Sequence, residues 1–420
     1  TINTSMKKLS ILGLCLLAVA SASAQKSLVK EVEGKAKGFN ADYAAARDQL
    51  KPALTNPESK DEAQTWYVAG TIEFGDYDAM LGKKAVGQQV DEPKMGRALL
   101  DGYKYYMTAF PLDTVVEKDK NGSPKLNKDG SPKTKTKYSK DMAKKLAAHY
   151  NDYVTGGQLL WDAKDYAGAY DAWNIYTTMP ENKSLGEEAP KAPADSIVGE
   201  ILYFQGLAAW QAEKLPVALE SFNAARAKGY NTPSLYDYAI SVAAQSQDND
   251  AVVALAQAAN DLYGETDSKY LTIIINDKIN NEKYDEAQTL LEKAIAVSPQ
   301  NAELYDVMGI LYQSKKNYDK AREYISKAVE LAPDNAKAHL DLGRVIYAQA
   351  VTIDEENQNL EQAEYNKLRA EKIDPMLKEA APYLEKALND ENTESEARRL
   401  LRSLYYSLGD ETNLKRIEAM

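Results

Sequence analysis

Two units of 34 residues follow one another between residues 268 and 335. The first reads SKYLTIIINDKINNEKYDEAQTLLEKAIAVSPQN (268–301), and the second reads AELYDVMGILYQSKKNYDKAREYISKAVELAPDN (302–335). Eight positions correspond at this spacing: Leu271, Ile274, Ile275, Lys278, Ala287, Leu291, Ala294 and Pro299 in the first unit, and Tyr305, Met308, Gly309, Tyr312, Ala321, Ile325, Ala328 and Pro333 in the second. A fixed period of this length indicates a chain built of repeated helical units.

The spacing within the second unit predicts two helices. Marked residues recur every three or four positions over 305–312 and again over 321–328, so each set lies on one face of a helix. Gly309 on the first helix is expected to face Ala321 on the second. Small residues at both places allow the two backbones to approach closely.

The ends of these helices can also be predicted. Asn317 stands where the N-cap of the second helix is expected, and Pro333 cannot continue that helix. Neither helix can bury its apolar face alone, so neighbouring units must stack. The period and these residues resemble the tetratricopeptide repeat family, over nearly the whole mature chain. The resemblance implies an all-α fold, a right-handed superhelical α-solenoid of tandem helix–turn–helix repeats.

The resemblance divides the chain into segments. These are a signal peptide with an N-terminal extension (1–24), divergent N-terminal units (25–112), a basic loop rich in Lys, Gly and Pro (113–139), central repeat-like units (140–265), the two clear repeats (268–335), a unit with an extended helix (336–389) and C-terminal capping helices (393–420). In the unit 336–389, Gly343 and Ala380 occupy the positions of Gly309 and Ala321 but are 37 rather than 12 positions apart. The insert, 353–373, is charged and lacks Gly and Pro, so it is expected to extend the first helix.

Residues 6–24 have the features of a secretory signal peptide. A basic start (6–8) precedes an apolar run (9–20) and a small-residue site, with cleavage expected between Ala24 and Gln25. The apolar run is shorter than the ~20 residues that a spanning helix needs, which argues against a membrane anchor. Leu14 precedes Cys15 where a lipoprotein signal requires a small residue. We therefore expect export to a Gram-negative periplasm and a soluble mature protein with no membrane span and no cysteine.

Composition and motifs narrow the functional class. The chain has 420 residues, a net charge of −12 and a pI near 5.0, which argues against general nucleic-acid binding. No cluster of potential ligands has metal spacing, no loop has a phosphate-binding pattern, and no nucleophile elbow occurs. The two histidines, His149 and His339, lie on different units, and His339 occupies a position that packs inside its repeat. The sequence predicts no enzyme and no cofactor.

The remaining candidate site is the concave groove that the resemblance implies. In the family that the chain resembles, the first helix of each unit lines a concave surface. The resemblance places these partner-binding residues on it: Tyr67, Thr71, Phe74, Gln158, Trp161, Tyr203, Trp210, Tyr236, Asn276, Arg344 and Tyr347. Exposed Tyr and Trp are good interface anchors because they are large, stiff and able to hydrogen-bond. The alternative is that several of them, Trp161 and Trp210 in particular, fill the core between repeats.

One specialised binding mode of the family can be compared directly. Some relatives hold a peptide's terminal carboxylate with Lys, Asn and Arg at five fixed positions. This chain has Thr272, Asn276, Val307, Lys337 and Asp341 there, so three positions differ and Asp341 has the opposite charge. The resemblance therefore does not extend to that mode.

The loop 113–139 has two possible interpretations. It contains two near copies of a turn sequence, NGSPK and DGSPK, and seven lysines. It is either a docking finger for an acidic partner or surface, or a solvated, mobile hairpin. The sequence alone favours the second.

The sequence predicts a non-enzymatic periplasmic scaffold that binds a protein or extended peptide, with a cell-envelope or outer-membrane complex as its setting. The alternative is a glycan- or nutrient-binding accessory of an outer-membrane transporter, since stacked Tyr and Trp suit sugar rings. Acidic charge and repeat architecture are compatible with a monomer or a dimer.

Overall fold

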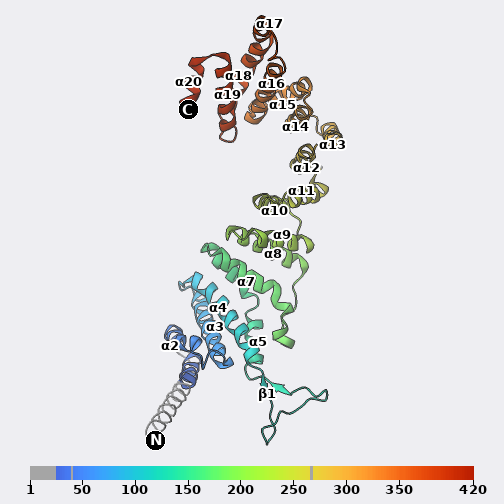
Figure 1. Ribbon diagram of the computed structural model, residues 1–420. Helices are drawn as coiled ribbons and strands as arrows, with labels where there is room; N and C mark the ends of the chain where they lie inside the picture. The colour runs from blue at the N-terminus through green and yellow to red at the C-terminus, as the bar shows by residue number, and fades with distance from the viewer. Residues whose placement is uncertain (1–24, 39–40, 265–267) are drawn as a thin grey trace, which may run out of the picture. The chain divides into compact units, whose positions relative to one another are not determined.

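The computed structural model describes residues 25–38, 41–264 and 268–420 (Figure 1). The expected signal peptide and Cys15 therefore lie outside the described residues. The chain divides into two compact units, the first ending at Asp248 and the second beginning at Asn249.

The first unit is a series of helices interrupted by one small hairpin. Residues 25–36 are helical. The further helices are α2 (Tyr43–Thr55), α3 (Ala63–Ala85), α4 (Glu92–Leu112), α5 (Ser139–Ala148), α6 (Asp152–Asp162), α7 (Tyr166–Thr178), α8 (Asp195–Gln211), α9 (Leu215–Ala227) and α10 (Pro233–Gln245), with short 3₁₀ turns at Met179–Glu181 and Lys183–Glu188. Between α4 and α5, strands β1 (Val115–Val116) and β2 (Thr134–Lys135) pair in antiparallel fashion.

The second unit is helical throughout its described residues. Its helices are α11 (Asn249–Tyr263), α12 (Lys269–Asn280), α13 (Tyr284–Val297), α14 (Ala302–Ser314), α15 (Tyr318–Leu331), α16 (Ala336–Glu356), α17 (Gln362–Leu368), α18 (Asp374–Ala387), α19 (Glu394–Leu408) and α20 (Glu411–Glu418). Most helices in each unit pack on their neighbours in sequence, which is the arrangement of a repeat solenoid. The expected all-α repeat class is therefore confirmed.

The helix boundaries and the close contact predicted for the second clear repeat are confirmed. The side chain of Asn317 accepts a hydrogen bond from the backbone N–H of Lys320, so it caps α15 as expected. A Cβ atom added at Gly309 would lie 2.2 Å from Ile325 Cγ1 and 3.0 Å from the carbonyl oxygen of Ala321. Only glycine leaves room for this approach of α14 to α15.

The turns between paired helices share one backbone conformation, which their residue types do not indicate because none of the residues is glycine. Lys164, Glu213, Gln247, Glu282 and Lys316 all have φ between 55° and 61°, the left-handed region. The residue after each donates its N–H to the carbonyl five positions earlier, as Asn317 does to Tyr312 at 2.8 Å. This is the Schellman termination, which glycine usually supplies. Here its recurrence near the repeat spacing marks it as part of the repeat.

The insert 353–373 was expected to extend the first helix of its unit, and for most of its length this expectation is wrong. Helix α16 continues only to Glu356, and α17 then follows as a separate short helix. A π-helical turn, Arg369–Ile373, joins α17 to α18. The predicted pairing across the insert is correct, because a Cβ atom at Gly343 would lie 2.7 Å from Leu384 Cδ2 and 3.3 Å from the carbonyl oxygen of Ala380.

Candidate functional site

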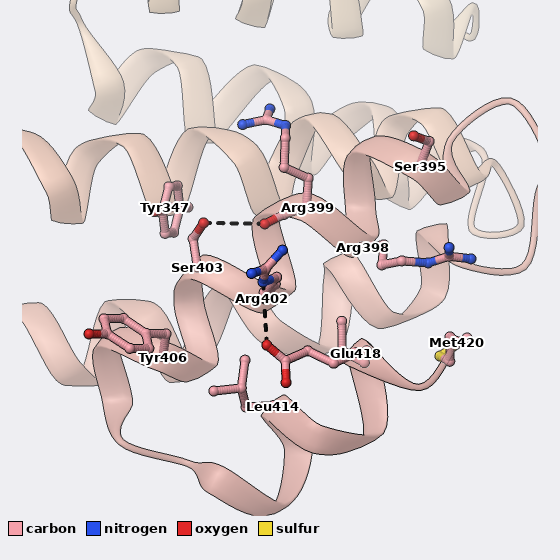
Figure 2. A pocket seen from close by; sticks show the side chains of 11 residues that line it. Tyr347, Ser395, Arg398, Arg399, Arg402, Ser403, Tyr406, Leu414, Glu418 and Met420 are labelled. Carbon is pink, nitrogen blue, oxygen red and sulfur yellow. Dashed lines mark hydrogen bonds and ion pairs between the residues drawn. The ribbon is translucent and has the colours of Figure 1, made fainter.

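An arginine-lined groove lies between α16, α19 and α20 in the second unit and encloses about 1180 Å³ (Figure 2). We call it the arginine groove. Its lining residues are Tyr347, Ser395, Arg398, Arg399, Arg402, Ser403, Tyr406, Leu414, Ile417, Glu418 and Met420. Most of them come from α19, and Tyr347 is contributed by α16.

The sequence of α19 explains why one helix face carries these groups. Ser395, Arg398, Arg399, Arg402 and Tyr406 recur at helical spacing on the groove side. The other face is apolar and buried, through Ala397, Leu400, Leu401 and Leu404. Burial of that stripe in the second unit fixes the rotation of α19 and so directs the arginines into the groove.

Arg398 pairs closely with Glu394, but the other two arginines of the groove are held only loosely by neighbouring carboxylates. Arg399 lies 3.7 Å from Glu396 and Arg402 lies 3.5 Å from Glu418, and both arginine side chains are more than two-thirds exposed. Exposed ion pairs of this kind contribute at most about 1 kcal/mol. Their guanidinium groups can therefore turn to a carboxylate of a bound segment, for which their planar fork is well suited.

Aromatic side chains flank the arginines. Tyr406 is 77% exposed, and Figure 2 shows its ring and that of Tyr347 at the same groove. Tyr rings beside Arg forks provide stiff apolar contacts and hydrogen-bonding groups, a combination that is enriched in binding hot spots. The groove has the chemistry for an acidic segment that also carries apolar side chains.

A buried charge cluster lies beside the groove on α14 and α16. The ammonium group of Lys337 lies 2.5 Å from Asp306 and 2.6 Å from Asp341, and Arg344 pairs with Asp341 and, at 3.5 Å, with Glu396. Asp306 and Asp341 are almost fully buried. Because Lys337 is already shared by two carboxylates, it is not poised to bind a peptide's terminal carboxylate.

Asp306 is the member of this cluster whose ionised form is least favoured by its surroundings. Burial, and next the carboxylate of Asp341, raise the pKa of Asp306 to about 7 despite the nearby Lys337. Its Oδ1 atom is buried without a hydrogen-bond partner. Protonation at this group therefore removes a cost of burial.

We expect Asp306→Asn to flatten the pH dependence of stability of the second unit. A carboxyl group whose pKa is raised by folding stabilises the fold below its unfolded value, and this contribution is lost as pH rises through about 7. Urea unfolding of the wild type should therefore show a loss between about pH 5 and pH 8, and the variant's loss should be smaller by about 1–3 kcal/mol. Exposed Asp334→Asn is the matched control, and an equal pH dependence in wild type and Asp306→Asn would refute the prediction.

A second, smaller pocket in the first unit brings together two of the predicted residues. Tyr67 and Thr71, both on α3, line a space of about 340 Å³ with Lys37, Tyr106, Asp141, Lys144, Lys145 and Ala148. The Tyr67 hydroxyl donates to Asp141 at 2.6 Å and accepts from Lys37 at 3.2 Å. Burial, and then the bond to Asp141, raise the pKa of Tyr67. Only the tip of Tyr67 reaches this pocket, because 96% of the residue is buried.

Two predicted partner-binding residues belong to the core instead. Phe74 is fully buried, with its ring 5.1 Å from that of Tyr106 and 5.0 Å from that of His149. Tyr236 is 2% exposed, and its hydroxyl donates to Asn231. Neither side chain can contact a partner without opening the packing of its helices, so for these two the alternative of a core role is correct.

Other predicted residues are half-buried among aromatic neighbours. Trp161 packs against Tyr166 and Trp173. Tyr203 lies near Phe204, Phe222, Tyr230 and Tyr238, and burial raises its pKa to about 12. Trp210 lies near Tyr238 and donates its indole N–H to Gln245 at 3.1 Å. These side chains contribute to packing and keep one accessible edge.

The last predicted residues are polar. Gln158 is exposed and donates to Asp162 at 2.8 Å. Asn276 is exposed and lines a hollow of about 520 Å³ beside α11. Arg344 and Tyr347 are half-buried, and of the predicted set only Tyr347 lines the arginine groove.

Sequence reasoning missed the arginines of α19. It assigned 393–420 to a capping pair and looked for site residues at the repeat positions of earlier helices. The available signal was local, since Arg398, Arg399 and Arg402 gather on the polar face of a strongly amphipathic helix, opposite its buried stripe.

The described residues were compared with the ligand sets that metal ions require. Within them, no group of three or more His, Cys, Asp or Glu side chains could hold a metal ion. His339 is buried and its Nε2 atom lies 2.8 Å from the carbonyl oxygen of Pro333, which confirms the expected core position. None of the described helices combines the length and apolar character needed to cross a bilayer.

Comparison with known proteins agrees with the repeat geometry. A family model described as "Tetratricopeptide repeat" matches residues 279–340. No curated protein matches the chain. Residues 279–340 of the chain therefore carry the tetratricopeptide repeat, as the resemblance of the clear repeats predicted.

Several solved structures are similar to this chain. One is a tetratricopeptide repeat protein from Parabacteroides merdae, 15% identical, with 61% of this chain and 99% of that chain covered and a TM-score of 0.38. Another is the C-terminal part of a TPR repeat-containing protein from Cytophaga hutchinsonii, 17% identical, covering 62% and 91% with a TM-score of 0.37. A third is YrrB, described as a TPR protein with an unusual peptide-binding site, 20% identical, covering 44% and 88% with a TM-score of 0.32.

Proposed function

We propose that this protein is a non-enzymatic scaffold of the periplasm that holds a protein or extended peptide within a cell-envelope or outer-membrane complex. Export rests on the signal-peptide features of residues 6–24. The scaffold role rests on the tetratricopeptide-repeat fold, whose stacked helices form extended binding surfaces.

The observation that carries the proposal is the arginine groove. It offers two exposed guanidinium forks, from Arg399 and Arg402, beside the exposed ring of Tyr406. In a chain with net charge −12, such a concentration of arginine on one helix selects an acidic ligand locally. The occupant that fits best is a partner segment with Asp or Glu side chains and at least one apolar side chain.

Charge reversal in the groove should release this partner. We expect Arg399→Glu with Arg402→Glu to weaken binding at least tenfold, because attraction becomes repulsion at two central contacts. The measurement is crosslinking in intact cells, affinity purification and mass spectrometry, followed by a titration of the recovered partner in purified form. Arg97→Glu with Lys327→Glu makes the same change of net charge away from the groove and should leave binding intact.

Two results would count against the proposal. One is the absence of any specific, stoichiometric partner from well-folded, exported protein. The other is a saturable change in tryptophan fluorescence with a polysaccharide, insensitive to the groove variant, which would favour the glycan-binding alternative.

A further inference from the structure

Residues 114–138 form a basic projection on the first unit, which we call the lysine finger. Figure 1 shows its loops extending away from α5 beyond β1. The finger contains two octads, EKDKNGSP (117–124) and KLNKDGSP (125–132), which adopt the same turn. In the first, Asp119 N–H donates to the Ser123 carbonyl at 2.8 Å, and in the second, Asn127 N–H donates to the Ser131 carbonyl at 2.8 Å.

The backbone of the finger is fixed by a closed ring of hydrogen bonds. Glu117 N–H donates to the Lys133 carbonyl at 2.7 Å, Lys125 N–H to the Glu117 carbonyl at 2.8 Å, and Lys133 N–H to the Lys125 carbonyl at 2.7 Å. These three residues are eight positions apart, so the octad repeat itself creates the ring. At the base, the buried carboxylate of Asp113 accepts the backbone N–H groups of residues 137–139. This bonding favours a defined structure over the mobile hairpin expected from composition.

The lysine side chains of the finger outnumber its carboxylates, so the finger is positively charged. Its seven lysines are all exposed: Lys118, Lys120, Lys125, Lys128, Lys133, Lys135 and Lys137. Against them stand three carboxylates, of which Asp119 and Asp129 accept hydrogen bonds from backbone N–H groups of their own turns. Glu117 lies 3.5 Å from Lys125 and 3.7 Å from Lys133. Lys118, Lys120, Lys128 and Lys135 form no ion pair with any residue that the structure describes.

Aliphatic side chains are exposed on the same projection. Leu126 is 62% exposed, Val115 is 53% exposed and Val116 is 37% exposed. Lysine with exposed aliphatic residues suits an anionic lipid surface, where ammonium groups meet the headgroups and short apolar groups enter the boundary with the acyl chains. Protein interfaces are instead enriched in Arg and aromatic residues and depleted in Lys. The lysine finger contains no Arg, Trp or Phe, and its single Tyr, Tyr138 at the base, stacks on Tyr67 with the ring centroids 4.5 Å apart.

We propose that the lysine finger docks the first unit on an anionic lipid surface. The contact is peripheral, involves no spanning helix, and is independent of the arginine groove in the second unit. A scaffold with both features holds its partner in the groove while the finger keeps it at a membrane.

Vesicle binding tests the proposal directly. The full chain should bind vesicles of equal parts phosphatidylglycerol and phosphatidylcholine, and rising salt should weaken this binding. The fourfold variant Lys118→Gln, Lys120→Gln, Lys128→Gln, Lys135→Gln should reduce it on the order of 1000-fold. The matched control replaces four exposed lysines elsewhere on the first unit, Lys51, Lys60, Lys104 and Lys191, by Gln, and should bind as the wild type does.

A label on the finger separates its contact from any binding through residues 1–24. The single cysteine, Cys15, is replaced by Ser, and Ser123→Cys carries an environment-sensitive fluorophore. The fluorophore should shift to the blue with phosphatidylglycerol vesicles and not with phosphatidylcholine alone. Equal binding by the fourfold variant and the control, or an unshifted label, would overturn the proposal. So would a label that responds to poly-glutamate but not to vesicles, which would assign the finger to an acidic protein.

Discussion

Replacing Arg47 by Met is expected to lower the free energy of unfolding of the first unit by about 2–4 kcal/mol. Arg47 on α2 makes a two-pronged contact with Glu73 on α3, with both N···O distances at 2.7 Å, and its Nη2 atom also lies 2.9 Å from Asp76. The carboxylates of Glu73 and Asp76 are nearly buried. Removing Arg47 leaves Glu73 without this partner, while Asp76 retains Lys94 at 3.0 Å. The loss of unfolding free energy is therefore large, but smaller than it would be if both carboxylates lost their only cationic partner.

Two further variants separate charge from shape. Arg47→Lys keeps the positive charge but not the planar fork, so it should recover only part of the stability. Adding Glu73→Gln to Arg47→Met removes the uncompensated buried charge and should recover more. Equal losses for Arg47→Met with and without Glu73→Gln would show that lost packing, rather than a stranded carboxylate, causes the effect.

The contact of Arg47 with Asp76 also predicts that the free energy of unfolding of the first unit falls at acidic pH. The hydrogen bonds from Arg47 and Lys94 outweigh the effect of burial and hold the pKa of Asp76 below its usual range. A depressed carboxyl pKa contributes stability above its unfolded value of about 4, and this contribution is lost as pH falls through the folded value. Urea unfolding from about pH 7 to pH 3 should show a smaller loss for Arg47→Met than for the wild type.

The repeat spacing predicted those parts of the fold that depend on contacts within one helical pair. Gly309 against Ala321 and Gly343 against Ala380 follow from the same packing rule, even though the second pair is separated by an insert. The path of that insert could not be predicted, because the charged residues of 353–373 suit a helix equally well when it is continuous or broken. Helix α16 ends at Glu356, and the short helix α17 that follows buries none of its residues.

The candidate site was less predictable, because exposure depends on what neighbouring helices cover. Phe74 occupies a groove position in its own repeat, but Tyr106 on α4 and His149 after α5 lie against its ring. The arginine groove requires α16, α19 and α20 to meet at a particular distance. That distance depends on long-range packing, which a repeat position does not encode.

Asp113→Ala is expected to cost the first unit about 2–4 kcal/mol and to loosen the base of the lysine finger. The Asp113 carboxylate is 2% exposed and lies 3.1 Å from the backbone nitrogen of Lys137, 2.8 Å from that of Tyr138 and 2.7 Å from that of Ser139. It also accepts the Ser139 hydroxyl at 2.7 Å. Helix α5 has no cap from its own N-cap side chain, so Asp113 accepts the N–H of its first residue, Ser139, and of the two residues before it, from outside the helix. The alanine variant leaves these donors without a partner.

The control for this prediction is an ordinary helix cap in the same unit. Asp91 caps α4 through one hydrogen bond, to the backbone N–H of Lys94, and is exposed, so Asp91→Ala should cost only about 1 kcal/mol. Asp113→Asn retains one acceptor oxygen and should fall between the two. Hydrogen exchange should show that the amides of 137–139 lose protection in Asp113→Ala. If that variant costs no more than Asp91→Ala and these amides stay protected, the finger is held by its own hydrogen-bond ring and Asp113 is not its anchor.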